Sequence, residues 1–190
     1  MLVDNNWSVI KLTQLYDPTE LVEDIPWERG NFTYVRPGVV NVQKDEGQVN
    51  GSFSRYNHPK FKKAFYHIKN VVESVIGEKV YPTYYFDRFY FKGNELVKHR
   101  DREACEISVS YHIWDNLDYE WPIYFQADND PKPCEITCKP GDGVLYRGMQ
   151  LDHWREPMRG NHKSCFHQVF FHYVRANGYC LHHAFDRHCE

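Results

Sequence analysis

The sequence predicts a mainly β protein with flanking helices, in which the strands form a sandwich or barrel. Aromatic residues make up 16 % of its 190 residues, which favours a sheet-rich core over a helical bundle. Strand-like runs separated by turns begin after residue 81, whereas helical and loop patterns come before it. A chain of 190 residues can bury one ordinary domain but not two. We therefore expect a single domain, with helical and loop support over 1–80, a strand core over 81–176 and a C-terminal tail over 177–190.

The supporting part of the chain carries two helix signals with a loop between them. Asp17, followed by Pro-Thr-Glu, is typical of a helix start, so a short helix should run to about Glu23. From Asn57 onward, apolar residues recur at three- and four-residue steps, which predicts an amphipathic helix that Asn57 caps and Gly77 ends. The segment Gly30–Ser54 is rich in Gly, Pro, Asn and Ser. We expect it to be a long loop or loosely held hairpin, of the kind that covers a binding site.

The strand core is rich in β-branched and aromatic residues and is divided by turns such as Asp128–Pro131 and Lys139–Gly143. The predicted strands are Thr83–Phe91, Cys105–Ile113, Trp121–Gln126, Cys134–Cys138, Gly143–Tyr146 and Ser164–Val174. The segment Cys180–Cys189 contains several Cys and His residues but lacks the paired Cys-x2-Cys of a zinc site. We expect it to be a solvated tail.

Composition argues against several classes of function. A formal charge of -3 and a pI near 6.4 give no broad basic surface for a nucleic-acid backbone, so a nucleic-acid partner is not expected. The first residues lack a basic leader followed by an apolar run, and no stretch of about 18 apolar residues occurs. We expect a soluble, cytoplasmic protein without membrane association. The six cysteines are few for a disulfide scaffold of this size, so we expect reduced thiols.

Three residues could form a metal centre. His99 and Asp101 are two positions apart, so in an extended strand their side chains leave the same face and can reach one ion, which His153 would complete. Two imidazoles and one carboxylate leave the opposite positions open, as non-haem Fe(II) oxygenases require. One His-x-Asp pair is expected by chance in a chain with 11 histidines, so the flanking sequence must decide. His167 and His172 compete as third ligand, but their spacing places them on opposite strand faces, so at most one points inward.

The flanking sequence resembles a known family. The pattern Tyr90-x-x-Gly-x-x-Leu-x-x-His99-x-Asp101 is followed in order by Trp121–Phe125, Lys139–Tyr146 and the run His-Trp-Arg-Glu that begins at His153. These elements, spread over residues 83–174, resemble the Fe(II)/2-oxoglutarate-dependent dioxygenases, and most closely their prolyl-hydroxylase-type branch. The resemblance implies a double-stranded β-helix, the jelly-roll or cupin-like fold. It also implies that His99, Asp101 and His153 hold the catalytic iron.

The resemblance implies an activity as well. Members of this family oxidise 2-oxoglutarate with dioxygen to succinate and CO2 and hydroxylate a C–H bond, and ascorbate is a candidate reductant. The expected substrate is an amino-acid side chain, free or in a peptide or protein, with proline as the first candidate. Because the metal ligands must be neutral imidazoles, iron occupancy should fall at acidic pH.

The residues that would hold 2-oxoglutarate follow from the same comparison. Tyr90 corresponds to the family tyrosine that hydrogen-bonds the co-substrate. The cation for the far carboxylate would follow the distal histidine by about ten residues, which matches Lys163. Arg155 competes with it, because this residue shares the face of His153 and a guanidinium can bind a carboxylate through two hydrogen bonds. Arg88 shares the face of Tyr90 and is a further candidate contact for a carboxylate.

Two other functions compete with amino-acid hydroxylation. The first is a non-catalytic jelly-roll that binds a metal or a small carboxylate. The second is a 2-oxoglutarate oxygenase that acts on a nucleobase or a small metabolite. Nucleobase chemistry would need a cationic groove, for which Lys98, Arg100 and Arg102 are the available start.

Overall fold

The computed structural model describes residues 7–23, 41–46 and 48–186. One α-helix, α1 (Lys62–Ile76), and several 3₁₀ turns accompany the strands. The strands are β1 (Val9–Leu12), β2 (Asn41–Glu46), β3 (Val49–Tyr56), β4 (Val80–Phe91), β5 (Leu96–His99), β6 (Ile107–Asp115), β7 (Ile123–Gln126), β8 (Cys134–Ile136), β9 (Gly143–Tyr146), β10 (Asp152–Arg155) and β11 (Cys165–Arg175). The 3₁₀ turns are η1 (Pro18–Glu20), η3 (Pro59–Phe61), η4 (Glu103–Cys105) and η5 (Tyr179–His183).

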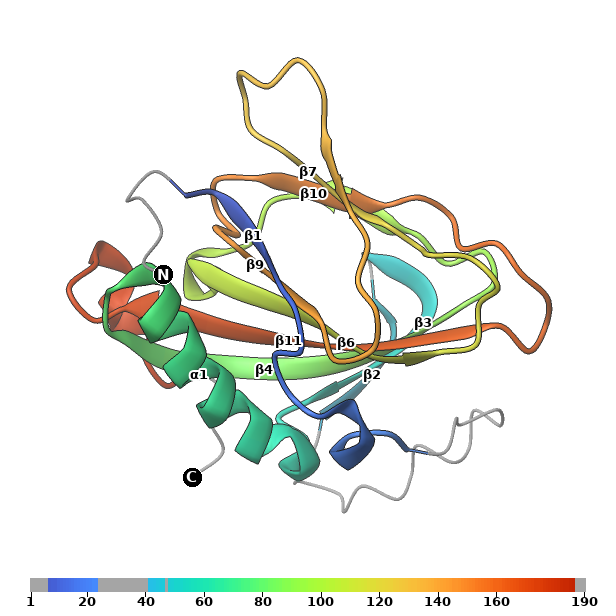
Figure 1. The fold of residues 1–190 in the computed structure, drawn as a ribbon, viewed down its shortest axis with the longest axis horizontal. Coiled ribbons are helices and arrows are strands. Elements are labelled where there is room, and N and C mark those ends of the chain that lie inside the picture. The colour runs from blue at the N-terminus through green and yellow to red at the C-terminus, as the bar shows by residue number, and fades with distance from the viewer. Residues whose placement is uncertain (1–6, 24–40, 47, 187–190) are drawn as a thin grey trace.

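The strands form two facing antiparallel sheets (Figure 1). The large sheet has the order β1-β9-β6-β11-β4-β3-β2, and the small sheet has the order β5-β10-β7-β8. From β4 to β11 the chain passes back and forth between the two sheets in the manner of a double-stranded β-helix, with β7 and β8 as a consecutive pair in the small sheet. The expected fold class, mainly β with flanking helical structure, is confirmed.

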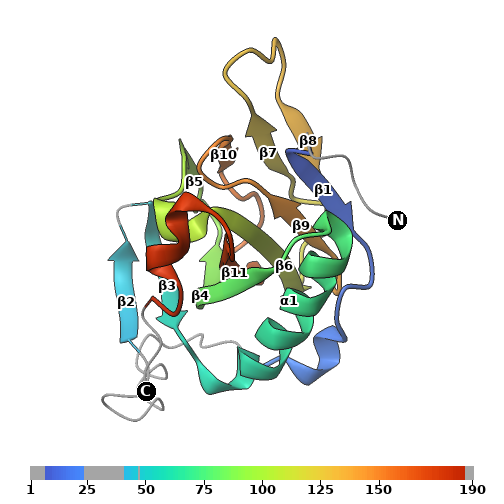
Figure 2. The ribbon, with the colours of Figure 1, turned by 90° about the vertical axis from the view of Figure 1, so that its left-hand side faces the viewer.

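The large sheet separates two interiors, because side chains alternate along each strand. On one face, α1 packs against the sheet and buries Phe65, Ile68 and Val72 with Phe171 and Tyr173 of β11 (Figure 2). The opposite face of the large sheet looks toward the small sheet. The space between the two sheets is where the predicted ligands gather.

The start of α1 differs from the sequence prediction, whereas its end agrees. Asn57 does not cap the helix, since its backbone takes a left-handed φ of 53°. Instead His58 accepts a hydrogen bond from Lys60 N (3.3 Å), and the helix proper begins only at Lys62, after η3. Gly77 ends the helix in the left-handed conformation, with a φ of 72°.

Two segments expected to be loose are ordered by pairing or burial. Within Gly30–Ser54, residues 30–40 lie outside the described residues, but β2 and β3 form a hairpin, and β3 pairs with β4 in the large sheet. The C-terminal segment, expected to be a solvated tail, forms η5, which buries Cys180. Phe185 N then donates to Pro82 O (2.7 Å), so the segment is fastened to β4 as far as the structure describes it.

The remaining sequence expectations concern thiols and membranes. The five cysteines among the described residues are free, in agreement with the expected reduced thiols. Within the part of the chain that the structure describes, no helix is long and apolar enough to span a membrane.

Candidate metal centre

The structure brings His99, Asp101 and His153 together at the edge of the barrel interior. His99 ends β5, and its direct pairing partner across the small sheet is His153 of β10. Asp101 follows two residues after His99, and its Oδ1 lies 3.6 Å from His99 Nε2 and 3.5 Å from His153 Nε2. One ligand atom from each residue lies within 4.8 Å of the others. Antiparallel pairing therefore joins ligands that are more than fifty residues apart in the chain.

Both imidazoles are oriented by the backbone. His99 Nδ1 lies 2.7 Å from Val97 O, and His153 Nδ1 lies 3.1 Å from Leu151 O. A carbonyl oxygen can only accept, so each Nδ1 carries the hydrogen and donates it, which leaves the lone pair on Nε2. Two lone pairs and the Asp101 carboxylate then face one point. This arrangement is repulsive unless a cation lies there, and its imidazole and carboxylate donors fit Fe(II).

The electrostatics of the centre follow from the same contacts. Burial would raise the pKa of Asp101, but attraction to His153 and the contact with His99 lower this pKa well below its usual range. Burial would lower the pKa of His153, but the Asp101 carboxylate raises it above the usual value. The carboxylate is thus ionised at any physiological pH. The imidazole of His153 is where protons compete with a metal.

Two contacts hold the Asp101 carboxylate and its backbone in place. Asp101 N donates to Gly148 O (3.0 Å), and Ser108 Oγ donates to Asp101 Oδ2 (3.2 Å). Gly148 has no room for a side chain, since a Cβ there would overlap Asp101 Oδ2 and lie 2.5 Å from Cys105 O. The strand pattern gave no sign that Gly148 and Ser108 belong to the centre, because only the folded register shows it.

His172 supports this arrangement from β11. Its Nδ1 lies 2.9 Å from Ser108 Oγ. Burial lowers the pKa of His172 to about 4, so the ring is neutral at physiological pH. When Nδ1–H donates to Ser108, the serine hydrogen is available to Asp101. His167 points to the other face of the sheet, where its Nε2 lies 2.8 Å from Asp87 Oδ2. Only His172 points inward, as the five-residue spacing predicts.

Arg155 lies deep in the same interior without an acidic partner. Its side chain is 4 % exposed and shares the face of His153, two residues earlier on β10. Nη1 donates to Trp121 O (2.6 Å) and Nη2 to Gln168 Oε1 (2.9 Å). Nε has no hydrogen-bond partner, and among the described residues no carboxylate pairs with this guanidinium. The guanidinium lies over the rings of Trp121 and Phe166, at 4.7 and 4.8 Å.

Tyr90 and Arg88 line the interior beside Arg155. Tyr90 is fully buried, with its ring edge-on to Trp121 at 5.1 Å, and its hydroxyl accepts from Arg88 Nη1 (3.2 Å). Arg88 also donates to Ser54 Oγ (3.1 Å) and to Gln48 Oε1 (3.5 Å). Both residues, which the sequence predicts as candidate co-substrate contacts, thus lie in the barrel interior.

Lys163 lies elsewhere. It is exposed on the turn before β11, where its backbone N donates to Asn161 Oδ1 (2.8 Å) and its carbonyl accepts from Asn116 Nδ2 (2.9 Å). Of the two candidate cations, the structure buries Arg155 in the barrel and leaves Lys163 at the surface.

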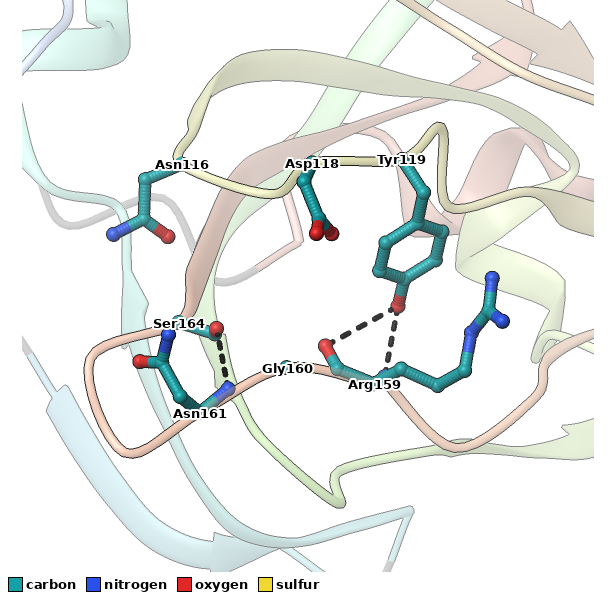
Figure 3. A pocket seen from close by; sticks show the side chains of 7 residues that line it. All are labelled: Asn116, Asp118, Tyr119, Arg159, Gly160, Asn161 and Ser164. Atoms are coloured by element: carbon teal, nitrogen blue, oxygen red, sulfur yellow. Dashed lines mark hydrogen bonds between the residues drawn. The ribbon is translucent and has the colours of Figure 1, made fainter.

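A separate cavity of about 640 Å³ opens between the loops that follow β6 and β10 (Figure 3). Its lining is polar, and Tyr119 Oη accepts from Arg159 N (2.8 Å) while Ser164 Oγ accepts from Asn161 N (2.9 Å). None of the predicted ligands or co-substrate residues lines it. The predicted ligands and the buried co-substrate residues thus lie in the barrel interior and not at this cavity.

Comparison with known proteins agrees with the fold. No family model and no curated protein matches the sequence. An oxidoreductase of the 2OG-Fe(II) oxygenase family from Burkholderia pseudomallei matches the structure with a TM-score of 0.64 at 14 % identity, over 90 % of this chain and 87 % of the other. A prolyl hydroxylase from Trichoplax adhaerens, in complex with a hypoxia inducible factor peptide fragment, matches with a TM-score of 0.60 at 13 % identity, over 89 % and 84 %.

A third match is HygX from Streptomyces hygroscopicus, with nickel, 2-oxoglutarate and hygromycin B bound. Its TM-score is 0.63 at 9 % identity, over 90 % of this chain and 84 % of the other. At such low identity these matches show the fold alone. The chain has the fold of the 2OG-Fe(II) oxygenases, prolyl hydroxylases among them.

Proposed function

We propose that this protein is an Fe(II)- and 2-oxoglutarate-dependent dioxygenase that hydroxylates an amino-acid side chain, with proline as the first candidate. One observation carries the proposal. A three-ligand cluster that needs a cation and a buried arginine that lacks an anion share the interior of one barrel. A divalent metal with 2-oxoglutarate would satisfy both.

Each residue of the interior would have a distinct task. His99, Asp101 and His153 would hold the iron, which with 2-oxoglutarate and dioxygen supplies the oxidation of a C–H bond and the release of succinate and CO2. Arg155 would bind the far carboxylate of 2-oxoglutarate through its guanidinium, and Tyr90 would donate a hydrogen bond to it. The buried rings of Trp121 and Phe166 would keep water from that carboxylate and so strengthen its ion pair with Arg155.

The segment Gly30–Ser54, of which the structure describes residues 41–46 and 48–54, is the proposed cover over the substrate. Ser54 and Gln48 of this segment contact Arg88 in the barrel interior, so the hairpin lies against the proposed site. Limited proteolysis of the iron-loaded protein, with and without 2-oxoglutarate and a turnover substrate, tests this role. Slower cleavage within residues 30–54 is expected, and unchanged cleavage would contradict the proposed cover.

The pairing of the surface cations argues against a nucleic-acid substrate. Arg100 pairs with Asp128 and Asp152, and Lys98 lies 3.6 Å from Asp152 Oδ2. Arg102 Nη2 lies 2.5 Å from Asp186 Oδ2. Cations already paired with carboxylates give a weak attraction for a phosphate backbone. Peptides and amino acids are the substrates to test first, and the match to a prolyl hydroxylase bound to a peptide supports this order.

The experiment measures succinate and product mass together. With Fe(II), ascorbate and 2-oxoglutarate, the wild-type protein should release succinate slowly without a prime substrate. It should add one oxygen to a member of a panel of proline-containing peptides and free amino acids. Asp101→Ala should abolish both signals, whereas Asp118→Ala, a change at an exposed aspartate, should leave both intact. Succinate release by Asp101→Ala at the wild-type rate would refute the proposal.

A further inference from the structure

A second group of metal-binding side chains lies outside the barrel interior, where η4 meets η5. Glu103 opens η4, while His182 and His183 close η5, the red turn that faces the viewer in Figure 2. One ligand atom from each residue lies within 4.8 Å of the others. The side chains are partly exposed, so an ion could reach them from solvent.

The spacing of these atoms fits a tetrahedral ion. His183 Nε2 lies 3.3 Å and His182 Nε2 lies 3.5 Å from the same atom, Glu103 Oε2. Zinc bonds to nitrogen and oxygen are about 2.0–2.2 Å long, and neighbouring ligands of a tetrahedral ion are then about 3.3–3.6 Å apart. The two contacts thus already have the length of tetrahedral edges.

The orientation of His182 is an independent sign. Its Nδ1 lies 3.1 Å from Tyr179 O, so Nδ1–H donates to that carbonyl and the lone pair of Nε2 faces Glu103. A backbone carbonyl orients His99 and His153 of the metal centre in the same way. Such a partner for the second nitrogen is typical of metal-bound histidines.

We infer that Glu103, His182 and His183 form a second divalent-metal site, suited to Zn²⁺, that fastens the C-terminal segment to the turn beside Asp101. Two imidazoles and one carboxylate are a common zinc ligand set, and solvent access leaves the fourth position to water. The metal would add to two ties that the segment already makes, the Arg102–Asp186 ion pair and the hydrogen bond from Phe185 N to Pro82 O. The inference is independent of the proposed oxygenase activity.

Zinc stoichiometry is the first test. Equilibrium dialysis of the full chain against Zn²⁺, at a pH where free imidazole is neutral, should find two ions per wild-type chain, one for the metal centre and one for the second site. The double variant His182→Ala/His183→Ala should bind one ion, and His162→Ala, at an exposed histidine outside both groups, should still bind two. Glu103→Gln should weaken the second site at least about tenfold, since even loss of an outer partner of a metal ligand has an effect of that size.

One result would overturn the inference: a double variant that binds as many zinc ions as the wild type, with wild-type affinity. Asp101→Ala is the complementary variant and should lose only the ion of the metal centre. Because the comparison of the wild type with the double variant is decisive by itself, the test survives if Asp101→Ala does not fold.

Hydrogen exchange tests the fastening itself. Zn²⁺ should slow amide exchange over residues 179–186 in the wild type and in His162→Ala, and should leave it unchanged in the double variant. A pair of simple imidazolium–carboxylate contacts would give the opposite pattern, with no response to zinc in any variant. Amide exchange that zinc leaves unchanged in the wild type would therefore refute the proposal that zinc fastens this segment.

Discussion

Replacement of Arg155 by methionine separates two possible roles of this residue, a contribution to the stability of the ligand-free barrel and a contribution to the affinity for 2-oxoglutarate. Arg155 is buried and donates hydrogen bonds to two neutral oxygens, Trp121 O and Gln168 Oε1. Among the described residues, its Nε has no hydrogen-bond partner. Burial lowers the pKa of this guanidinium from its usual value, because the charge is poorly solvated. Methionine fills a similar volume without the charge.

The free protein should tolerate this change. Replacing a buried ion pair by apolar residues of similar size is often neutral or stabilising by about 1–4 kcal/mol, and the charge of Arg155, unpaired among the described residues, has the same cost of burial without the attraction of a partner. Against this, Trp121 O and Gln168 Oε1 lose their donor, at about 1–3 kcal/mol each. At mid-range values of about 2.5 kcal/mol gained and about 4 kcal/mol lost, the two effects largely cancel, so urea unfolding should find a free energy of unfolding about 1–2 kcal/mol below that of the wild type.

Binding of 2-oxoglutarate should change far more. Removal of one partner of a buried, hydrogen-bonded charge pair costs about 2–5 kcal/mol. The Kd for 2-oxoglutarate should therefore increase by a factor between about 30 and several thousand. Isothermal titration of 2-oxoglutarate into the Mn²⁺-loaded protein measures the change, and Lys163→Met is the matched control because Lys163 is exposed. Unchanged affinity in Arg155→Met, or a larger loss in Lys163→Met, would refute the assignment.

Three further predictions concern the metal ligand and the buried charges. Gly148→Ala should lower metal affinity at least about tenfold, because the new Cβ collides with the Asp101 carboxylate; equal zinc or manganese affinity would contradict this. Metal affinity should fall as the pH drops from about 8 to about 6. The pKa of His153 is raised, so protons compete with the metal for this imidazole at a higher pH than for an ordinary histidine, whereas Asp101 stays ionised. Titration of Mn²⁺ at each pH measures the affinity, and an affinity that does not change with pH would argue against His153 as a ligand. Asp87→Asn should lower the free energy of unfolding in urea at neutral pH by at most about 3–5 kcal/mol, because the buried Arg55 then loses Asp87 but keeps Glu23 as a carboxylate partner. Burial would raise the pKa of Asp87, but Arg55 lowers it to about 2, so this stabilisation is present above the ordinary value of 3.8 and lost toward pH 2. The wild type should therefore lose about 2 kcal/mol more than the variant over that range, and parallel profiles would disprove the coupling.

The strands of the core could be predicted because their composition is a consequence of burial on both faces. In β4 and β11 nearly every residue is buried, so β-branched and aromatic residues follow one another. The short strands β5 and β10 carried no such signal. Each spans four residues and includes charged side chains that face solvent or the metal centre, so the ligands they present were easier to find than the strands.

The residues that support the metal centre could not be found in the same way. Ser108 and His172 act through Asp101, and their contacts depend on the register between β6 and β11, in which these two residues are direct partners. Gly148 acts through its lack of a side chain, at a place where only the folded loop shows the collision. Such contacts join segments that no local pattern relates. The sequence predicts which side chains lie on each face of a strand, but not which residues of other segments they contact.

The two candidate cations, Lys163 and Arg155, were predicted by different kinds of sequence argument, and these differ in how well they locate a residue in the structure. Lys163 was a candidate because of a separation of about ten residues from the distal histidine, and such a count assumes a loop of fixed length and shape. Here the turn closes around Asn161 and Ser164, β11 begins only at Cys165, and Lys163 stays outside. Arg155 was a candidate because residues two apart on a strand share a face, which depends only on backbone geometry. That geometry survives any change in the loop, and it places the guanidinium in the interior that His153 faces.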